Sequence, residues 1–375
     1  MSTPITSYES HHEPMLEPAM ADVVPLFPSQ PEGFLFVSQP NTVDLLPAEL
    51  DPMPVRRPVR GLGQTTLKAV RTSRAGRLDN PIRHHRLYGV NINDYQHAVE
   101  ITDPAEGEPQ YAIMSLPGLT EHIECGIRQA FHASLAEKFP AGRIISVGSD
   151  GIGPNSDTYN WQERHQYDLE GMARHRVELA LALAARLPLF VQGTSMGTTV
   201  SHHMNRQILA DDELRSLIDP RGQLYVSPAL VDPHNIVRDM GLRFVPGLAW
   251  DLGKELGLKS SRSEIAEALA LAKSYGLSRR DGKALVNQMW ELMHGTPEKE
   301  IGEVIAEIPT VVVAGEKDSL AQWQMWHRIQ GQYPDNLELH SIRGRGHVMA
   351  LKPGRICDKL SRTAQAKILS STLAS

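Results

Sequence analysis

The stretch Pro188-Leu-Phe-Val-Gln-Gly-Thr-Ser-Met-Gly-Thr-Thr199 is typical of a short buried strand that turns abruptly into a helix. Gly193 and Gly197 flank Ser195, and a Cβ at either glycine would collide with the neighbouring strand or helix. Such a turn places the Ser195 hydroxyl above the carboxyl edge of a sheet, near the positive end of the following helix. The backbone N–H of Met196 is then placed to bind an oxyanion. Ser195 is therefore a candidate nucleophile, although an ordinary glycine-rich turn can carry the same pattern.

Composition limits what this chain of 375 residues can be. With 41% hydrophobic residues, it is long enough to bury one large core or two modest ones. The net charge of −6 argues against a nucleic-acid-binding protein, which is usually basic. Two cysteines, Cys125 and Cys357, indicate no disulfide framework and favour a reducing compartment. No apolar run of about 18 residues predicts a membrane span, and residues 1–20 lack the pattern of a signal peptide. We therefore expect a cytoplasmic protein.

Residues 1–86 differ in composition from the rest of the chain. Residues 1–54 hold eight carboxylates and no Lys or Arg, whereas residues 56–86 hold nine Lys or Arg and one acidic residue. One interpretation is a proline-rich, poorly ordered and solvated arm. The other is an arm that wraps on the body of the protein or on a second subunit, with Phe27 and Phe34 among its apolar anchors. A homo-oligomer formed through this arm follows from the second interpretation.

From residue 87 onward, strand and helix patterns alternate. Residues 88–93 and 97–102 alternate in the manner of two antiparallel strands. Further apolar strands are predicted at residues 111–116, 143–147, 188–192, 223–227, 309–314 and 337–342. Helical patterns separate most of these strands. The sequence therefore predicts an α/β fold with a mostly parallel central sheet and helices on both faces.

The alternation stops between the strand that ends near residue 228 and the strand that starts near residue 309. The intervening residues are mostly helical in pattern and carry several Trp and Met residues. An insertion of this length is usually a lid or a binding feature. The predicted parts are an arm at residues 1–86, a core at 87–231 and 306–375, and a helical cap at 232–305.

Two further residues follow strands of the predicted sheet. Asp318 comes after the first strand beyond the insertion, and His347 comes after the last strand. Parallel strands deliver their carboxyl ends to one edge, so both residues should lie near Ser195. A serine needs a base to take its proton, and an imidazole does this best when a carboxylate fixes its tautomer. The sequence thus predicts a triad of Ser195, Asp318 and His347, with a helix-capping role as the alternative for Asp318.

These patterns resemble the α/β-hydrolase superfamily from about residue 87 onward. Residues 193–197 resemble its nucleophile elbow, residues 315–318 its acid turn, and Gly346-His347 its base turn. Residues 149–156 are similar to the loop after the fourth strand, but they lack the arginine of that loop. The resemblance implies an α/β-hydrolase fold with a helical lid, and Asp232 is the alternative acid that some members of the superfamily use.

The resemblance also implies a second oxyanion donor. The superfamily usually has His-Gly in this loop, whereas here it is Pro117-Gly118, and by position the second N–H comes from Leu119. Glu121 and His122 lie close to this loop. We interpret both as polar surface residues rather than as substrate contacts.

The leading hypothesis is a serine hydrolase that cleaves an ester, thioester or amide of a small acyl substrate through an acyl-enzyme. The sequence carries no metal-ligand spacing and no phosphate-binding loop, so we expect neither a metal nor a cofactor. An acyltransferase of the homoserine acetyltransferase kind would use the same triad. A ligand-binding protein on the same fold, with little turnover, is the alternative from another class.

Overall fold

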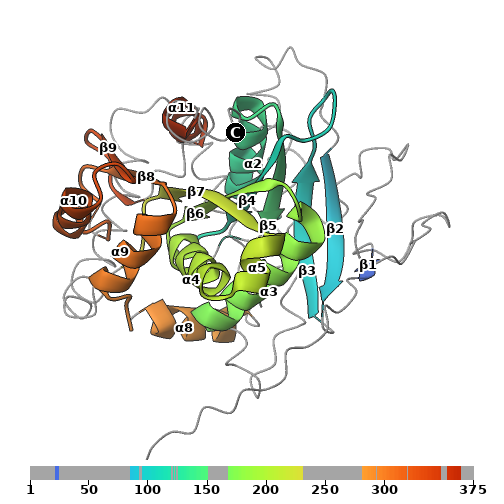
Figure 1. Ribbon diagram of the computed structural model, residues 1–375, viewed down its shortest axis with the longest axis horizontal. Helices are drawn as coiled ribbons and strands as arrows, with labels where there is room; N and C mark the ends of the chain where they lie inside the picture. The colour runs from blue at the N-terminus through green and yellow to red at the C-terminus, as the bar shows by residue number, and fades with distance from the viewer. Residues whose placement is uncertain are drawn as a thin grey trace, which may run out of the picture.

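The computed structural model describes residues 22–24, 85–92, 95–119, 121, 123, 126–150, 168–230, 281–292, 294–318, 320–347 and 353–364. Within these residues, nine strands form one sheet in the order β1-β2-β3-β5-β4-β6-β7-β8-β9 (Figure 1). The strands are β1 (Asp22–Val24), β2 (His85–Ile92), β3 (Tyr95–Thr102), β4 (Tyr111–Leu116), β5 (Gly142–Val147), β6 (Pro188–Thr194), β7 (Asp219–Val226), β8 (Thr310–Gly315) and β9 (Leu337–Ile342). The helices are α2 (Gly126–Lys138), α3 (Leu169–Ala184), α4 (Met196–Ala210), α5 (Asp212–Leu217), α8 (Asp281–Leu292), α9 (Glu298–Glu307), α10 (Trp323–Gln332) and α11 (Pro353–Ala364).

The strand directions make the sheet mostly parallel. The strands from β4 to β9 pair in parallel with one another. Only the amino-terminal edge of the described sheet is antiparallel, since β3 pairs in that sense with β2 and β5, and β1 pairs in that sense with β2. The predicted α/β class with a mostly parallel sheet is confirmed, as is the predicted antiparallel pair.

Alternation of side chains along the strands divides the core into two layers. On β4, Ala112, Met114 and Leu116 face the core layer that contains α3 and α4. Tyr111 and Ile113 face the opposite way and pack in the layer that contains α2 and α11. Helices α9 and α10 pack on the face that also carries α3 and α4 (Figure 1). Each strand in the middle of the sheet is therefore buried on both faces, which explains its nearly continuous apolar sequence.

The boundaries differ from the sequence predictions in small ways. Helix α2 begins at Gly126 rather than near residue 123, and the short helix α5 was not predicted. Between β7 and β8 the structure describes α8 and α9, whereas residues 231–280 lie outside the described residues. The helical cap at 232–305 therefore remains a prediction. Of the predicted arm, the structure describes only residues 22–24 and 85–86.

The carboxyl ends of the parallel strands lie at one edge of the sheet. Strand β6 ends at Thr194, directly before Ser195, and β8 ends at Gly315, three residues before Asp318. Strand β9 ends at Ile342, five residues before His347. The topology thus brings three residues from distant parts of the sequence to the same edge, as predicted from the strand order.

Candidate active site

Ser195 occupies a strained backbone conformation between β6 and α4. Its φ of 50° and ψ of −117° lie outside the regions that L residues normally occupy, at a cost of about 1–3 kcal/mol. The surrounding backbone holds this conformation. The N–H of Ser195 donates to the carbonyl of Val226 at 2.9 Å, and its carbonyl accepts from the N–H and the hydroxyl of Thr198 at 3.0 and 2.6 Å. The serine side chain is therefore presented at the tip of a rigid turn.

The two glycines of the turn have no room for a side chain. A Cβ on Gly193 would lie 2.5 Å from the carbonyl oxygen of Gly197, at the start of α4. A Cβ on Gly197 would lie 2.5 Å from the carbonyl oxygen of Leu116, at the end of β4. Both contacts are with backbone atoms, which cannot move aside cheaply. The predicted reason for a glycine at each position is confirmed.

The three predicted triad residues lie within hydrogen-bonding distance of one another. The Oγ of Ser195 is 2.8 Å from Nε2 of His347. The Nδ1 of His347 is 3.0 and 3.1 Å from the two carboxylate oxygens of Asp318. The Asp318 side chain is fully buried, whereas the His347 side chain has an exposed fraction of 8%. This arrangement allows a proton to pass from the hydroxyl to the imidazole while the carboxylate fixes the orientation of the ring.

Asp318 is held by its own turn as well as by the histidine. Its Oδ1 accepts hydrogen bonds from the N–H groups of Leu320 and Ala321 at 2.9 and 3.2 Å. Helix α10 begins only at Trp323, so these bonds stabilise a turn before the helix. The alternative that Asp318 caps the following helix is therefore wrong, because the N-cap of α10 is Gln322, and the same carboxylate contacts both its own turn and His347. The alternative acid, Asp232, lies outside the described residues.

Close backbone packing brings the acid turn to the base turn. The N–H groups of Glu316 and Lys317 donate to the carbonyls of Ile342 and Arg345 at 3.0 and 2.8 Å. A Cβ on Gly315 would lie 2.3 Å from the carbonyl oxygen of Arg345, so only glycine allows the two turns to approach this closely. These contacts fix the positions from which Asp318 and His347 extend.

The turn that follows β4 lies directly against Ser195. A Cβ on Gly118 would lie 3.4 Å from the Cβ of Ser195, so the backbone at residues 117–119 passes beside the candidate nucleophile. Met196 begins α4 on the other side of the serine and is fully buried. The assignment of oxyanion donors to Leu119 and Met196 remains a prediction.

Glu121 was predicted to be a polar surface residue, and that prediction is wrong. Its exposed fraction is 5%, and its Oε2 accepts a hydrogen bond from the N–H of Gly118 at 2.8 Å. Burial raises the pKa of Glu121, while the Arg128 guanidinium, the Gly118 bond and His347 act in the opposite direction. Arg128 is itself buried in α2 and donates to the carbonyl of Ser115 on β4. His122 lies outside the described residues.

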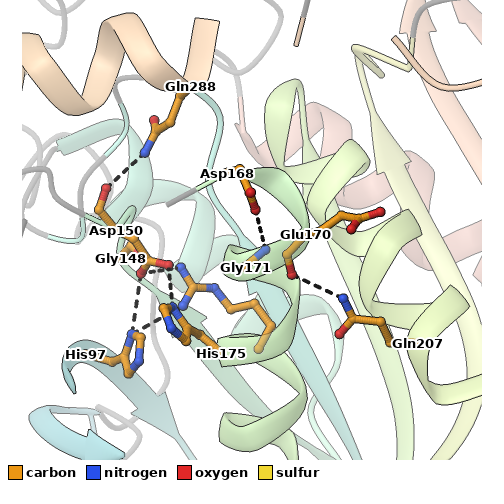
Figure 2. Close-up of polar contacts among 10 residues, drawn as sticks. His97, Gly148, Asp150, Asp168, Glu170, Gly171, His175, Gln207 and Gln288 are labelled. Atoms are coloured by element: carbon orange, nitrogen blue, oxygen red, sulfur yellow. Dashed lines mark hydrogen bonds and ion pairs between the residues drawn. The ribbon is translucent and has the colours of Figure 1, made fainter. Parts of the chain in front are cut away.

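A second group of buried titratable residues surrounds Asp150, which follows β5. The Nη2 of Arg176, on α3, is 2.7 Å from the Asp150 carboxylate and also donates to the carbonyl of Gly148 at 3.1 Å. The Nδ1 atoms of His97 and His175 are 3.4 and 3.3 Å from the same carboxylate. Figure 2 shows His97 and His175 approaching Asp150 from separate segments of the chain. Residues 149–156 lack the arginine that the superfamily has in this loop. In this structure an arginine from α3, Arg176, contacts Asp150 of the loop instead.

Within this group, the negative charge of Asp150 is balanced by the positive charge of Arg176. Burial alone would raise the pKa of Asp150, but Arg176 and the hydrogen bonds of His175 and His97 hold it well below the usual range. Burial lowers the pKa of His97 to about 4, despite the opposing effect of Asp150. The amide of Gln288, on α8, donates to the backbone carbonyl of Asp150 at 2.9 Å (Figure 2). The group therefore ties β3, α3 and α8 to the loop after β5.

The part of the chain that the structure describes holds neither a metal-ligand cluster nor a membrane-spanning helix. No cluster of three or more His, Cys, Asp or Glu side chains in this part of the chain could hold a metal ion. Among its helices, none is long and apolar enough to span a membrane.

Comparison with solved structures identifies the fold. A membrane phospholipase A described as a bacterial virulence factor matches with a TM-score of 0.57 and 15% identity, over 83% of this chain and 92% of its own. A protein from Acinetobacter baumannii described as a lipase matches at 0.55 and 12% identity, over 86% and 99% of the two chains. Proline iminopeptidase from Mycobacterium smegmatis matches at 0.52 and 14% identity, over 76% and 99%. The chain has the α/β-hydrolase fold. No family model and no curated protein matches it.

Proposed function

We propose that this protein is a serine hydrolase that cleaves a carboxylic ester, thioester or amide. The observation that carries the proposal is the chain of contacts from Ser195 Oγ through His347 to the Asp318 carboxylate, with successive distances of 2.8 and 3.0 Å. The strained backbone of Ser195 supports the same reading, because strain of this kind concentrates at functional sites.

The chemistry would proceed in two halves. Ser195 Oγ attacks the substrate carbonyl carbon as His347 Nε2 takes the hydroxyl proton, and the amides of Met196 and Leu119 stabilise the oxyanion. When the tetrahedral intermediate collapses, His347 returns the proton to the departing alcohol, thiol or amine. A water molecule then attacks the acyl-enzyme, with His347 as base, and releases the acid and the free serine. Asp318 keeps the imidazole in the required tautomer throughout.

The structural neighbours agree with acyl hydrolysis but do not choose the substrate. They are described as a phospholipase A, a lipase and a proline iminopeptidase, so their names point to different substrates. Function on a shared fold is decided by the site rather than by the scaffold. The leaving group and acyl chain therefore have to be measured.

An activated serine can be tested by intact-mass analysis after treatment with a fluorophosphonate. In this reaction Ser195 Oγ forms a bond to phosphorus, fluoride leaves, and His347 takes the proton. We expect one adduct on the wild type, none on Ser195→Ala, and slower labelling of His347→Ala. Ser216→Ala is the matched control, since Ser216 lies on α5 and bonds only its own helix carbonyl at Glu213 among the contacts described.

Two outcomes would overturn the proposal: an adduct that persists in Ser195→Ala, or a folded wild type that forms none. If the adduct forms as expected, esters, thioesters and amides of graded chain length would identify the substrate class. Adding an alcohol as acceptor would then distinguish hydrolysis from acyl transfer, because only acyl transfer produces the ester of the added alcohol.

A further inference from the structure

Glu121 makes two opposed hydrogen bonds with Gly118. The backbone N–H of Glu121 donates to the carbonyl of Gly118 at 3.1 Å, which closes a four-residue turn. The backbone N–H of Gly118 donates in return to Oε2 of Glu121 at 2.8 Å. The turn from residue 118 to 121 is thus closed by two hydrogen bonds, one between backbone groups and one to the Glu121 side chain. Leu119, the proposed oxyanion donor, lies inside it.

This turn is anchored to both the sheet and the candidate nucleophile. Arg128 interacts electrostatically with the Glu121 carboxylate and donates to the carbonyl of Ser115, on the strand that leads into the turn. On its other side, the turn approaches Ser195 so closely that a Cβ on Gly118 would lie 3.4 Å from the serine Cβ. A shift of the turn would therefore change the distance between the Leu119 amide and the reacting carbonyl.

The Glu121 bond also decides which amide of the turn can face a substrate. The N–H of Gly118 is directed to the carboxylate and is not available as an oxyanion donor in this arrangement. A carboxylate this close to a developing oxyanion would oppose catalysis through its charge, and the buried Arg128 offsets part of that charge. The arrangement suits a structural acceptor rather than a group that exchanges protons with the substrate.

We propose that Glu121 is a positioning residue for the oxyanion turn, acting through its bond to the Gly118 N–H to hold the Leu119 amide beside Ser195. The proposal rests on the proposed serine hydrolase function. Glu121 contacts no reacting atom in this scheme, and its contribution to the rate comes from the placement of a donor. Misplacement of a catalytic group by about 1 Å can lower a rate by about 10²-fold.

Two conservative variants distinguish the effect of the length of the Glu121 side chain from the effect of its charge. Glu121→Gln keeps the length of the side chain and an oxygen that can accept the Gly118 N–H, but it removes the charge. Glu121→Asp keeps the charge but is one methylene shorter, so its carboxylate falls short of Gly118. Glu106→Asp, in the exposed segment between β3 and β4, is the matched control for the second change.

The measurements are the rate of fluorophosphonate labelling and the kcat and KM for p-nitrophenyl butyrate, with thermal unfolding to verify folding. We expect Glu121→Asp to label about 10²-fold more slowly and to lose kcat by a similar factor, with KM little changed. We expect Glu121→Gln to remain within about fivefold of the wild type, because a neutral acceptor makes a weaker bond of the same geometry. A merely structural role would alter unfolding without this split between kcat and KM.

The remaining outcomes overturn the proposal. If Glu121→Asp reacts as fast as the wild type, or if Glu121→Gln is as slow as Glu121→Asp, the hydrogen bond to Gly118 does not position the turn. Failure of the wild type to label is a different result, because it removes the serine hydrolase function itself. Normal labelling of wild type and both variants removes only the role of Glu121.

Discussion

Two buried aspartates in this molecule each contact histidine, and they lie after different strands of the same sheet. Asp318 follows β8 and contacts His347, whereas Asp150 follows β5 and contacts His97 and His175. In the first group, the far nitrogen of the ring meets a serine hydroxyl at 2.8 Å. In the second, the carboxylate is matched by a guanidinium at 2.7 Å.

The two groups differ in the other partners of the aspartate and the histidine. The Asp318 carboxylate is satisfied by two backbone N–H groups and one histidine, and the other ring nitrogen of that histidine is directed at the Ser195 hydroxyl. The Asp150 carboxylate faces the full charge of Arg176, and both side chains are completely buried. An Asp–His contact at the carboxyl edge of a sheet is therefore a weak indicator of catalysis. We propose that the third partner, a serine hydroxyl or a guanidinium, decides whether such a pair supports catalysis or only stability.

The largest effect should come from Asp318→Asn. An asparagine can still accept the N–H bonds of Leu320 and Ala321, but it leaves the imidazole in the wrong tautomer to act as a base. We expect kcat for a p-nitrophenyl ester to fall by about 10⁴-fold. The free energy of unfolding, measured in urea, should stay within about 1 kcal/mol of the wild type, since the backbone bonds are retained.

A retained rate would contradict the proposal that Asp318 is the acid of a triad. If Asp318→Asn keeps its rate, the carboxylate is not the acid of a triad, and its role is limited to the turn before α10. Ester hydrolysis by this variant should then match that of Glu106→Gln, a change at an exposed carboxylate far from the three turns.

The same substitution at Asp150 should produce the opposite pattern. Asp150→Asn leaves the fully buried Arg176 without its counter-charge, and removing one partner of a buried ion pair typically costs about 3–5 kcal/mol. We expect urea denaturation to report a loss of this size. At a temperature where the variant remains folded, fluorophosphonate labelling of Ser195 should persist. Abolished labelling in a fully folded Asp150→Asn protein would contradict the division between the two groups.

The sheet and the convergence of Ser195, His347 and Asp318 could be predicted because both rest on local signals. Ser195, Asp318 and His347 each lie within about five residues after a predicted strand, and the topology then brings them to one edge of the sheet. The glycines at 193 and 197 carry their own steric explanation. These parts of the molecule depend on pattern and chain order, both of which are visible in the sequence.

The Asp150 group had a signal that strand and helix periodicity could have revealed. His97 shares its face of β3 with Val99 and Ile101, which belong to the core. Arg176 lies on α3 one turn after Met172 and one turn before Ala180, both of which are also in the core. A polar residue at an apolar position must find a partner, so each of these two residues predicts a buried polar contact. The identity of the partner still required the fold.

Glu121 carried no such signal. It lies in a loop without periodicity, and the buried Arg128 that interacts with its carboxylate comes from α2. A carboxylate three residues after a glycine suits a closed turn equally well on the surface. Only the three-dimensional arrangement separates these two environments.

The smallest effect concerns the protonation of His97. Burial lowers its pKa from 6.5 to about 4, so above pH 6.5 the ring is neutral in the folded and unfolded states alike. Between these two values the unfolded chain binds a proton that the folded protein does not, and stability falls as the pH decreases. Over the whole window this contribution amounts to roughly 3 kcal/mol. Asp150 affects stability only below its ordinary pKa of 3.8, outside this range.

A His97→Gln variant can isolate this contribution. His202 and His203, whose pKa values are lowered to about 3 and about 4 chiefly by burial, titrate in the same window and are unchanged in the variant. We therefore expect urea denaturation between pH 7 and pH 4.5 to give a shallower loss of stability in His97→Gln than in the wild type. Equal slopes would mean that His97 is protonated when folded, with Asp150 rather than burial controlling its charge. The histidine of the Asp150 group would then resemble that of the triad, which must accept a proton in every proposed catalytic cycle.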